Sequence, residues 1–374
     1  MSIELNIPNI SSVEKKIVNK ALNKNEISTY GSNVLKLEEK LKRYTGSKYN
    51  LAVNSGSSGL SLAYLSSGIL KNDLIIMPSY TFAATANSVY HAGGLPWFFD
   101  IDKDTFCINT KQLNQVLKKN TFQKNKQCFL KKNKQRVFAI TPVFTFGLLP
   151  NLKELKKVAK KYNLKIIADA ACALGSKFEN KNHTDYSDIS IFSLNGNKSF
   201  TAGGGGIVST NNKRFFLKAK SLATNCKTKN YNYSGIGFNL RITNLHASIA
   251  LAQINRFIEI YNKKKRITEI YENRLKKFKF LPKNLWCKNI LWFNVIILEK
   301  KNNLSKVLKF IKSKKINCAS FWKPLHLQNP YKKFKKENLD YTNEVWNKIL
   351  VLPSSSNLNK LDLNEVIKTI NSIN

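Results

Sequence analysis

Two ionisable residues follow consecutive apolar segments and could together act on an aldehyde. Asp169 follows the apolar segment Leu164–Ala168, and Lys198 lies 29 residues later in the turn Asn195–Lys198, ahead of four consecutive glycines. A lysine amine can condense with an aldehyde, and a carboxylate can keep a ring nitrogen protonated. Because a protein contributes these two groups to pyridoxal phosphate chemistry, the pair predicts a site for that cofactor.

A turn of small residues near the N-terminus could hold a phosphate group. The run Asn54–Gly59 (NSGSSG) lies between a predicted strand at 49–53 and a predicted helix at 60–67. Backbone N–H groups and hydroxyls at a helix N-terminus bind anionic groups, so Ser57 and Ser58 are candidate phosphate ligands. Such turns also occur as ordinary helix caps. The glycines at 203–206 come after the lysine, the reverse of a P-loop, so we expect them to permit tight backbone passage and positive φ.

Strands alternate with helices over much of the chain, which predicts a mostly parallel sheet with helices on both faces. A long helical pattern from Leu245 to Leu275 follows, and shorter strands and helices continue to Asn374. We therefore expect an α/β protein with a large domain at 1–255 and a smaller C-terminal α/β domain at 256–374. The strands predicted for the sheet are Tyr49–Val53, Leu74–Met77, Trp97–Asp100, Val137–Pro142, Leu164–Ala168, Ile189–Ser193 and Ile207–Thr210.

The formal net charge of +39 is the most unusual bulk property of the chain. Only seven of the 62 basic residues are arginine, and the lysines are dispersed over the polar faces of periodic segments. Nucleic-acid binding favours a concentrated basic patch, so nucleic acid is an unlikely partner. The lysines predict a solvated surface whose positive field would attract an anionic small substrate.

The other bulk properties indicate a globular protein of the cytoplasm. Six cysteines are scattered without a C-x-x-C pair or a cysteine–histidine cluster, which argues against a metal site and a disulfide framework. No apolar run approaches the length of a membrane span, and the N-terminus does not resemble a signal peptide.

Six short segments carry a resemblance to a known family: Ser28–Gly31 with Leu37-Glu38, Asn54–Ser58, Pro78–Thr85, Asp169–Ala171, Asn195–Lys198 and Gly237–Arg241. In their order and spacing they resemble the sugar-aminotransferase family of pyridoxal-phosphate enzymes, the DegT/DnrJ/StrS group. Each segment alone is a weak signal, but together they cover nearly the whole chain. The resemblance implies the architecture of a fold-type I pyridoxal-phosphate-dependent transferase.

The resemblance also implies roles for individual residues. Lys198 would bond to the cofactor aldehyde and then move a proton between substrate and cofactor, while Asp169 would pair with the ring nitrogen. A site completed by a neighbouring subunit implies at least a homodimer. The other implied contacts are with the cofactor phosphate (Ser57, Ser58, Ser193 and, from the neighbouring subunit, Asn239), the ring face (Phe82), the ring hydroxyl (Cys172) and the sugar (His326).

The implied substrate is a nucleotide-linked 4-keto-6-deoxy sugar. The motif at 195–198, together with Phe321–His326 and Leu352–Ser355, is most similar to enzymes that aminate UDP-4-keto-6-deoxy-N-acetylhexosamines for bacillosamine or legionaminic-acid-type glycans. An amino acid, L-glutamate in our expectation, would be the donor. The product would enter a bacterial surface glycan such as lipopolysaccharide.

Four positions depart from the family pattern. Ala168 stands where a glutamate is usual, Phe144 where histidine is common, and Ala319 where close relatives tend to carry arginine. Cys172 replaces a glutamine, histidine or glutamate beside the ring hydroxyl. Because a thiol is a weak hydrogen-bond partner, Cys172 could tune the cofactor differently or reflect a relaxed constraint.

Alternative interpretations remain open at this point. A related sugar dehydratase would carry histidine in place of the lysine, so Lys198 argues against that activity. A catalytically idle or regulatory protein of the same fold, binding anionic ligands or nucleic acid, is suggested by the charge and the four departures. His326 follows Pro324 in an apolar run and could instead be a hydrogen-bonded structural histidine.

Overall fold

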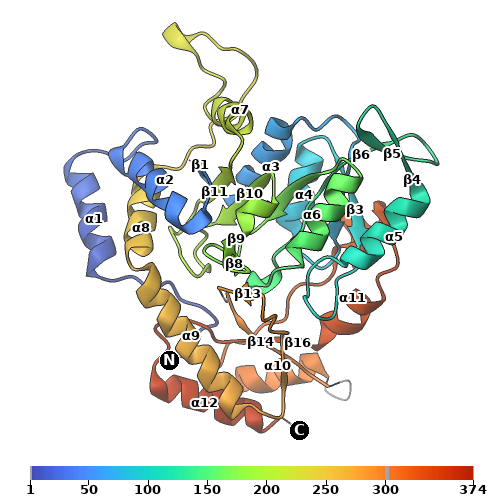
Figure 1. Ribbon diagram of the computed structural model, residues 1–374. Helices are drawn as coiled ribbons and strands as arrows, with labels where there is room; N and C mark the ends of the chain where they lie inside the picture. The colour runs from blue at the N-terminus through green and yellow to red at the C-terminus, as the bar shows by residue number, and fades with distance from the viewer. Residues whose placement is uncertain (1, 291, 300–302, 374) are drawn as a thin grey trace.

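The computed structural model describes residues 2–290, 292–299 and 303–373, and its largest element is a 10-stranded sheet (Figure 1). Its strand order is β1-β11-β10-β7-β6-β2-β3-β15, with the hairpin β4–β5 attached to β6. Strands β10, β7, β6, β2, β3 and β15 run parallel, whereas β11 is antiparallel to both of its neighbours. The mostly parallel sheet is therefore confirmed. The strands are Tyr49–Val53 (β1), Leu74–Pro78 (β2), Leu95–Phe99 (β3), Thr121–Lys124 (β4), Gln127–Leu130 (β5), Arg136–Ile140 (β6), Lys165–Asp169 (β7), Ile189–Ser193 (β10), Gly206–Thr210 (β11) and Lys335–Lys336 (β15).

Helices cover both faces of this sheet, as expected. Successive strand residues point to opposite faces, so Ile166 and Ala168 join one apolar core and Ile167 joins the other. The first core is closed by α2 (Ser32–Thr45), α5 (Thr110–Asn120), α6 (Leu152–Lys161) and α8 (Asn244–Asn255). The second is closed by α3 (Gly56–Ser67), α4 (Ala83–His91) and α7 (Lys213–Ala223).

A smaller α/β unit follows in the chain. Its antiparallel sheet contains β12 (Lys279–Phe280), β14 (Asn294–Ile297) and β16 (Ile349–Leu352), in that order. An apolar core joins these strands to α9 (Phe257–Arg274), α10 (Leu304–Ser313) and α12 (Lys360–Asn371). The remaining elements are α1 (Ser12–Asn23), α11 (Asp340–Val345) and a second small sheet made of β8 (Lys177–Phe178), β9 (Lys181–Asn182) and β13 (Cys287–Lys288).

The long helical pattern after residue 245 consists of two helices and not one. The break falls at Arg256, whose φ of −97° and ψ of 13° end α8 before α9 begins. The guanidinium of Arg256 bonds to Glu14 and Glu259 at this point. The predicted domain boundary falls at the same residue. However, Leu325 and β15 return to the large sheet, so the second half of the chain also contributes to the first unit.

A loop between α7 and α8 projects away from the body of the molecule (Figure 1). It carries exposed apolar side chains: Tyr231, Tyr233 and Ile236 are 75%, 60% and 94% exposed. Such a protruding apolar segment is typical of a surface that contacts another chain. Within the described residues, no helix combines the length and apolar character needed to cross a membrane.

We predict that Glu14→Gln destabilises the protein by about 3 kcal/mol, because Glu14 is buried and its loss leaves the guanidinium of Arg256 paired with the exposed Glu259 alone among the described residues. Burial alone would raise the pKa of Glu14, but hydrogen bonds from Ser11 and Arg256 outweigh it and lower that pKa. The stabilisation is therefore present at neutral pH and is lost as the pH falls through the lowered pKa. Urea unfolding at several pH values measures this difference.

The matched control is Glu259→Gln, which removes an exposed carboxylate that also contacts Arg256. Its expected cost is at most about 1 kcal/mol. Equal destabilisation by the two substitutions, or a Glu14→Gln effect that does not change with pH, would contradict this account.

Candidate active site

Four segments meet at the carboxyl edge of the large sheet. Strands β7, β10 and β2 run in the same direction, and β1 points the same way because two antiparallel pairings separate it from β10. Asp169 ends β7, Lys198 lies in the turn after β10, Ser57 follows β1, and Phe82 follows β2. These four residues line one cavity of about 550 Å³. The cavity lies where open α/β sheets bind their ligands.

Asp169 lines this cavity and is buried, with 6% of its surface exposed. Its carboxylate accepts hydrogen bonds from the Thr85 hydroxyl at 2.7 Å and the Ala171 N–H at 3.2 Å. Burial nevertheless raises the pKa of Asp169, although these two hydrogen bonds and the positive charge of Lys198 oppose the shift. A cationic N–H group placed in the cavity would favour the charged carboxylate.

Lys198 is held between a thiol and an indole ring. Its Nζ lies 3.3 Å from Cys172 Sγ and 3.7 Å from the centroid of the Trp292 ring, within the range of a cation–π contact. The Trp292 Nε1–H donates to the carbonyl of Asn197 at 2.6 Å, so the same side chain also fixes the backbone of the lysine turn. The ring therefore controls both where the turn lies and where the amine rests.

The turn at the start of α3 is shaped by its own serines. Ser55 caps the helix: its hydroxyl accepts from the Ser58 N–H at 3.0 Å and lies 2.8 Å from the Ser58 hydroxyl. Ser57 is exposed and lines the cavity, as does the half-buried Ser193. A Cβ added at Gly56 would lie 3.2 Å from Ser193 Cβ, so glycine lets the helix start approach β10. Ser57, Ser193 and the free N–H groups of the helix thus surround a space suited to an anion.

The glycines after Lys198 take the conformations that the sequence predicts. Gly203 and Gly205 have φ of +78° and +129°. A Cβ at Gly206 would lie 2.5 Å from the carbonyl oxygen of Ser55. These residues therefore bring the backbone against the Ser55–Ser58 turn, which a larger side chain would prevent.

Aromatic side chains form the walls of the cavity. Phe82 is 59% exposed, an unusual state for a phenylalanine beside a cavity. The same space is lined by three aromatic residues from the second half of the chain, Trp292, Phe321 and Trp322. Trp322 stacks on Phe146 with ring centroids 5.4 Å apart. An exposed ring at a cavity wall suits a flat ligand, because such a ligand would cover its apolar face.

The four departures from the family pattern occupy different environments. Cys172 and Phe144 line the cavity, and seclusion from water raises the pKa of the Cys172 thiol. Phe144 packs edge-on against His183, whose pKa burial lowers to about 4. Ala168 is fully buried in the core, so a glutamate there would be a buried charge. Ala319 pairs through its backbone with Val351 of β16.

Three of the predicted site residues do not line this cavity in their own chain. Ser58 lines a neighbouring depression together with Ser57 and Phe82. Asn239 is exposed beside the projecting loop, so its predicted phosphate contact would have to be made with another subunit. His326 is buried, with Nδ1 2.7 Å from the Ser79 hydroxyl and Nε2 2.9 Å from Asn343 Oδ1. These contacts fit the alternative that His326 is a hydrogen-bonded structural histidine. The predicted contact of His326 with the sugar finds no support within this cavity.

Several residues that build the site were not identified as site residues from the sequence. Thr85 bonds to Asp169, Trp292 contacts Lys198, and Thr145 lines the cavity with a buried hydroxyl that has no hydrogen-bond partner in the described part of the chain. Of these three residues, only Thr85 belongs to a segment that the sequence analysis recognised, residues 78–85. Its spacing from Asp169 does not mark it as a partner of that carboxylate.

A flat, phosphate-bearing pyridine fits this set of groups. Asp169 forms no ion pair with any lysine or arginine in the described part of the chain, Phe82 offers a ring face, and Ser57 and Ser193 lie beside a helix N-terminus. The decisive comparison is with protein families: the model of the DegT/DnrJ/EryC1/StrS aminotransferases matches residues 8–371. The chain belongs to this aminotransferase family. It is a pyridoxal-phosphate-dependent enzyme.

Curated relatives of the family align along almost their whole length. The chain is 27% identical to GDP-perosamine synthase of Caulobacter vibrioides, over 99% of this chain and 98% of that protein. It is 29% identical to UDP-4-amino-4,6-dideoxy-N-acetyl-β-L-altrosamine transaminase of Campylobacter jejuni, over 98% and 96% of the two chains. Among solved structures, an aminotransferase of Helicobacter pylori involved in pseudoaminic acid biosynthesis superposes with a TM-score of 0.90 at 24% identity, covering 99% and 98%. The structural likeness confirms the fold.

We predict that Thr85→Val weakens pyridoxal phosphate binding roughly tenfold at neutral pH, because it removes a hydrogen bond to a charged carboxylate. Without that bond the pKa of Asp169 rises further. Cofactor affinity should fall as the pH drops through this pKa, because a neutral carboxyl would no longer hold a protonated ring nitrogen, so the loss should begin at a higher pH in the variant. Titration of the cofactor-free protein, followed by absorbance across pH, gives the affinities.

Thr85→Ser is the matched control, because it retains the hydroxyl and should stay within about threefold of the wild type. An unchanged pH profile in Thr85→Val would remove Thr85 from the cofactor site.

Proposed function

We propose that this enzyme transfers an amino group from L-glutamate to the keto carbon of a nucleotide-linked 4-keto-6-deoxy sugar. The observation that carries the proposal is the meeting of Lys198 and Asp169 in one cavity of a chain that belongs to a sugar-aminotransferase family. The relatives from Caulobacter and Campylobacter, whose names specify perosamine and an amino-dideoxy altrosamine, support the choice of sugar. The motif at 195–198 supports the same choice.

Bound pyridoxal phosphate would supply an electron sink for the charge that develops beside the reacting nitrogen. Asp169 would hold the proton of the ring nitrogen in place, since its carboxylate is buried and oriented by Thr85. Ser57 and Ser193, with the N–H groups at the start of α3, would bind the phosphate. Phe82 would cover one face of the ring.

Lys198 would act as the proton carrier of the reaction. Its free amine Nζ would take a proton from the α-carbon of the amino-acid donor. In the second half of the cycle it would deliver a proton to the sugar carbon that receives the amino group. The Trp292 ring and Cys172 Sγ, 3.7 Å and 3.3 Å from Nζ, would hold the amine within the cavity between these transfers. Trp292 and Trp322 would also exclude water from the reacting atoms.

Lys198→Ala should abolish turnover, lowering the rate by roughly 10³-fold or more, because the variant lacks the proton carrier. The measurement is amino-sugar formation from UDP- and GDP-linked 4-keto-6-deoxy sugars, with glutamate as donor and no other amine present. Lys218→Ala, on the exposed surface of α7, is the control and should retain wild-type turnover. Multiple turnovers by Lys198→Ala would contradict the assigned role, and failure of every nucleotide sugar with the wild type would contradict the substrate class.

We further propose that the enzyme works as a cytoplasmic homodimer, in which Asn239 of one subunit completes the phosphate site of its partner. The exposed position of Asn239 beside the projecting apolar loop supports this arrangement, and the six free cysteines fit a reducing compartment. The product would then serve bacterial surface glycans such as lipopolysaccharide.

A subunit-mixing experiment tests the shared site. Lys198→Ala and Asn239→Ala should each be impaired alone, Asn239→Ala by about tenfold through loss of a phosphate contact. Refolded mixtures should regain activity, because one site of each mixed dimer would combine the intact Lys198 and the intact Asn239. Activity of the mixture equal to the average of the separate variants would contradict a site built from two subunits.

A further inference from the structure

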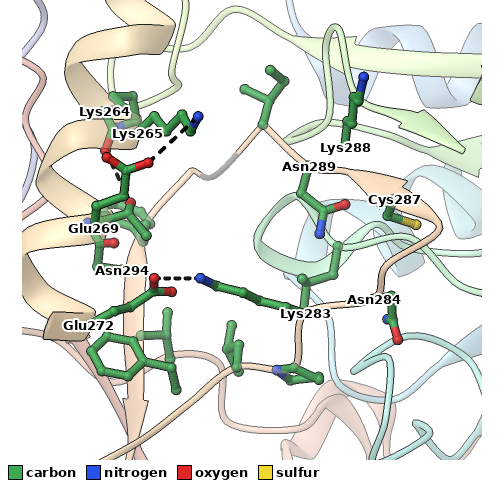
Figure 2. Close-up of a pocket in the computed structure, with 18 of the residues that line it drawn as sticks. Lys264, Lys265, Glu269, Glu272, Lys283, Asn284, Cys287, Lys288, Asn289 and Asn294 are labelled. Carbon is green, nitrogen blue, oxygen red and sulfur yellow. Dashed lines mark hydrogen bonds and ion pairs between the residues drawn. The ribbon is translucent and has the colours of Figure 1, made fainter. Parts of the chain in front are cut away.

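A second cavity of about 400 Å³ lies between α9 and the segments 280–290 and 293–295 (Figure 2). None of the described residues lines both this cavity, termed here the α9 cavity, and the catalytic cavity. The two cavities are nevertheless neighbours, because Trp292 lines the catalytic one and the next residue, Phe293, lines the α9 cavity. Its size is sufficient for a small organic molecule.

A buried lysine is the most unusual group in the α9 cavity. Lys264 is 7% exposed, and its Nζ donates to the carbonyl oxygen of Ser354 at 2.6 Å. In the described part of the chain no carboxylate lies within ion-pair distance of this amine. Burial lowers the pKa of Lys264 to about 7, so the amine is poised between its two protonation states. An anion beside Nζ would favour the charged form.

Two amide oxygens in the same cavity also lack partners. Asn294 is 6% exposed, and its Nδ2 donates to the Ser354 hydroxyl at 3.1 Å, but its Oδ1 has no hydrogen-bond donor within the described residues. The Oδ1 of Asn289 is in the same state, and Figure 2 shows this side chain at the cavity wall opposite α9. Buried acceptors of this kind favour a ligand that carries hydroxyl or N–H donors.

The remaining charges of the cavity leave an excess of positive charge. Figure 2 shows the two α9 glutamates that line the cavity in ion pairs: Glu269 with Lys265 at 3.6 Å and Glu272 with Lys283 at 2.5 Å. Lys264 has no such partner among the residues that the structure describes, and Lys288 lies exposed at the opposite wall. An entering anion therefore meets cations whose charge the cavity itself does not neutralise.

The walls between these polar groups are apolar and partly aromatic. Phe200 and Phe293 are 3% and 2% exposed, and Leu148, Ile290 and Val295 are also buried. A simple inorganic anion would leave this surface in contact with water. A ring-bearing molecule would cover it, and each Å² of apolar surface removed from water favours binding.

We propose that the α9 cavity binds a small ring-bearing organic anion, a carboxylate or phosphate monoester with a hydroxyl or N–H donor. Its anionic group lies beside Lys264, its ring lies against Phe200 and Phe293, and its donor reaches Asn294 or Asn289. The site is separate from that of the nucleotide sugar, and its existence does not depend on which substrate the catalytic cavity takes.

The experiment uses the cofactor-loaded enzyme and ligand-observed NMR titrations with matched probes. 4-Hydroxybenzoate and 4-hydroxyphenyl phosphate present the two anionic groups on the same hydroxylated ring. 4-Hydroxybenzamide lacks the charge, and benzoate lacks the hydroxyl. At least one of the two anions should bind about tenfold more tightly than the amide, and removal of the hydroxyl should cost several-fold.

Substitutions locate the bound probe. Lys264→Met keeps the length of the side chain but removes the charge, and should weaken the anion about tenfold. It should also abolish the fall in affinity that the wild type shows as pH rises through 7, where Lys264 loses its proton. Lys263→Met, on the exposed side of the same helix, is the control and should bind normally. Asn294→Asp provides a second test, because its carboxylate would neutralise Lys264 and repel the anion.

Each outcome decides the proposal. Retained visible absorbance of the bound cofactor shows that the catalytic cavity of each variant is intact. Loss of anion binding in Lys264→Met or Asn294→Asp, with binding kept in Lys263→Met, supports the site. Equal binding of the amide and both anions, or binding that Lys264→Met leaves unchanged, overturns it. Neither result depends on transamination, so failure of this proposal and failure of the proposed reaction remain distinguishable.

Discussion

A carboxylate buried at the edge of a sheet is the constraint on which the catalytic site depends. Burying a charge is costly unless a partner compensates it, and the described residues supply Asp169 with two hydrogen bonds and the field of Lys198. The resulting rise in its pKa marks a site that is electrostatically incomplete without a cation. In the proposed function the protonated nitrogen of the cofactor would complete it, and this would link the stability of the charge directly to cofactor binding.

The fold holds this charge in place through rigid surroundings. Residues before Asp169 alternate between two apolar cores, so β7 is fixed on both faces. Parallel strands bring Asp169, Lys198 and Phe82 to the same edge, while Gly56 permits the start of α3 to approach β10. The region after α9 then contributes Trp292, which closes the cavity over Lys198 and secures its turn. The same segment separates this cavity from the positively charged α9 cavity.

The sequence predicts those parts of the site that follow strands directly. Asp169, Lys198, Ser57 and Phe82 could be identified because each follows an apolar segment or belongs to a recognised motif. Trp292 could not, because its contact with Lys198 joins residues far apart in the chain and arises only when the second half folds onto the first. The two-residue strand β15 is too short to produce a periodic pattern, and the break at Arg256 depends on a distant partner, Glu14. The environment of His326 depends equally on Ser79 and Asn343, which no spacing connects to it.

The most direct test of the central claim is an absorption spectrum of the purified protein, before and after addition of glutamate, with Lys198→Ala beside it. The account predicts a visible band from cofactor bound to Lys198, which bleaches with glutamate and is missing from the variant. A protein that stays colourless after incubation with pyridoxal phosphate, or a variant with the same spectrum as the wild type, would contradict the assignment of Lys198 and Asp169 as the cofactor site.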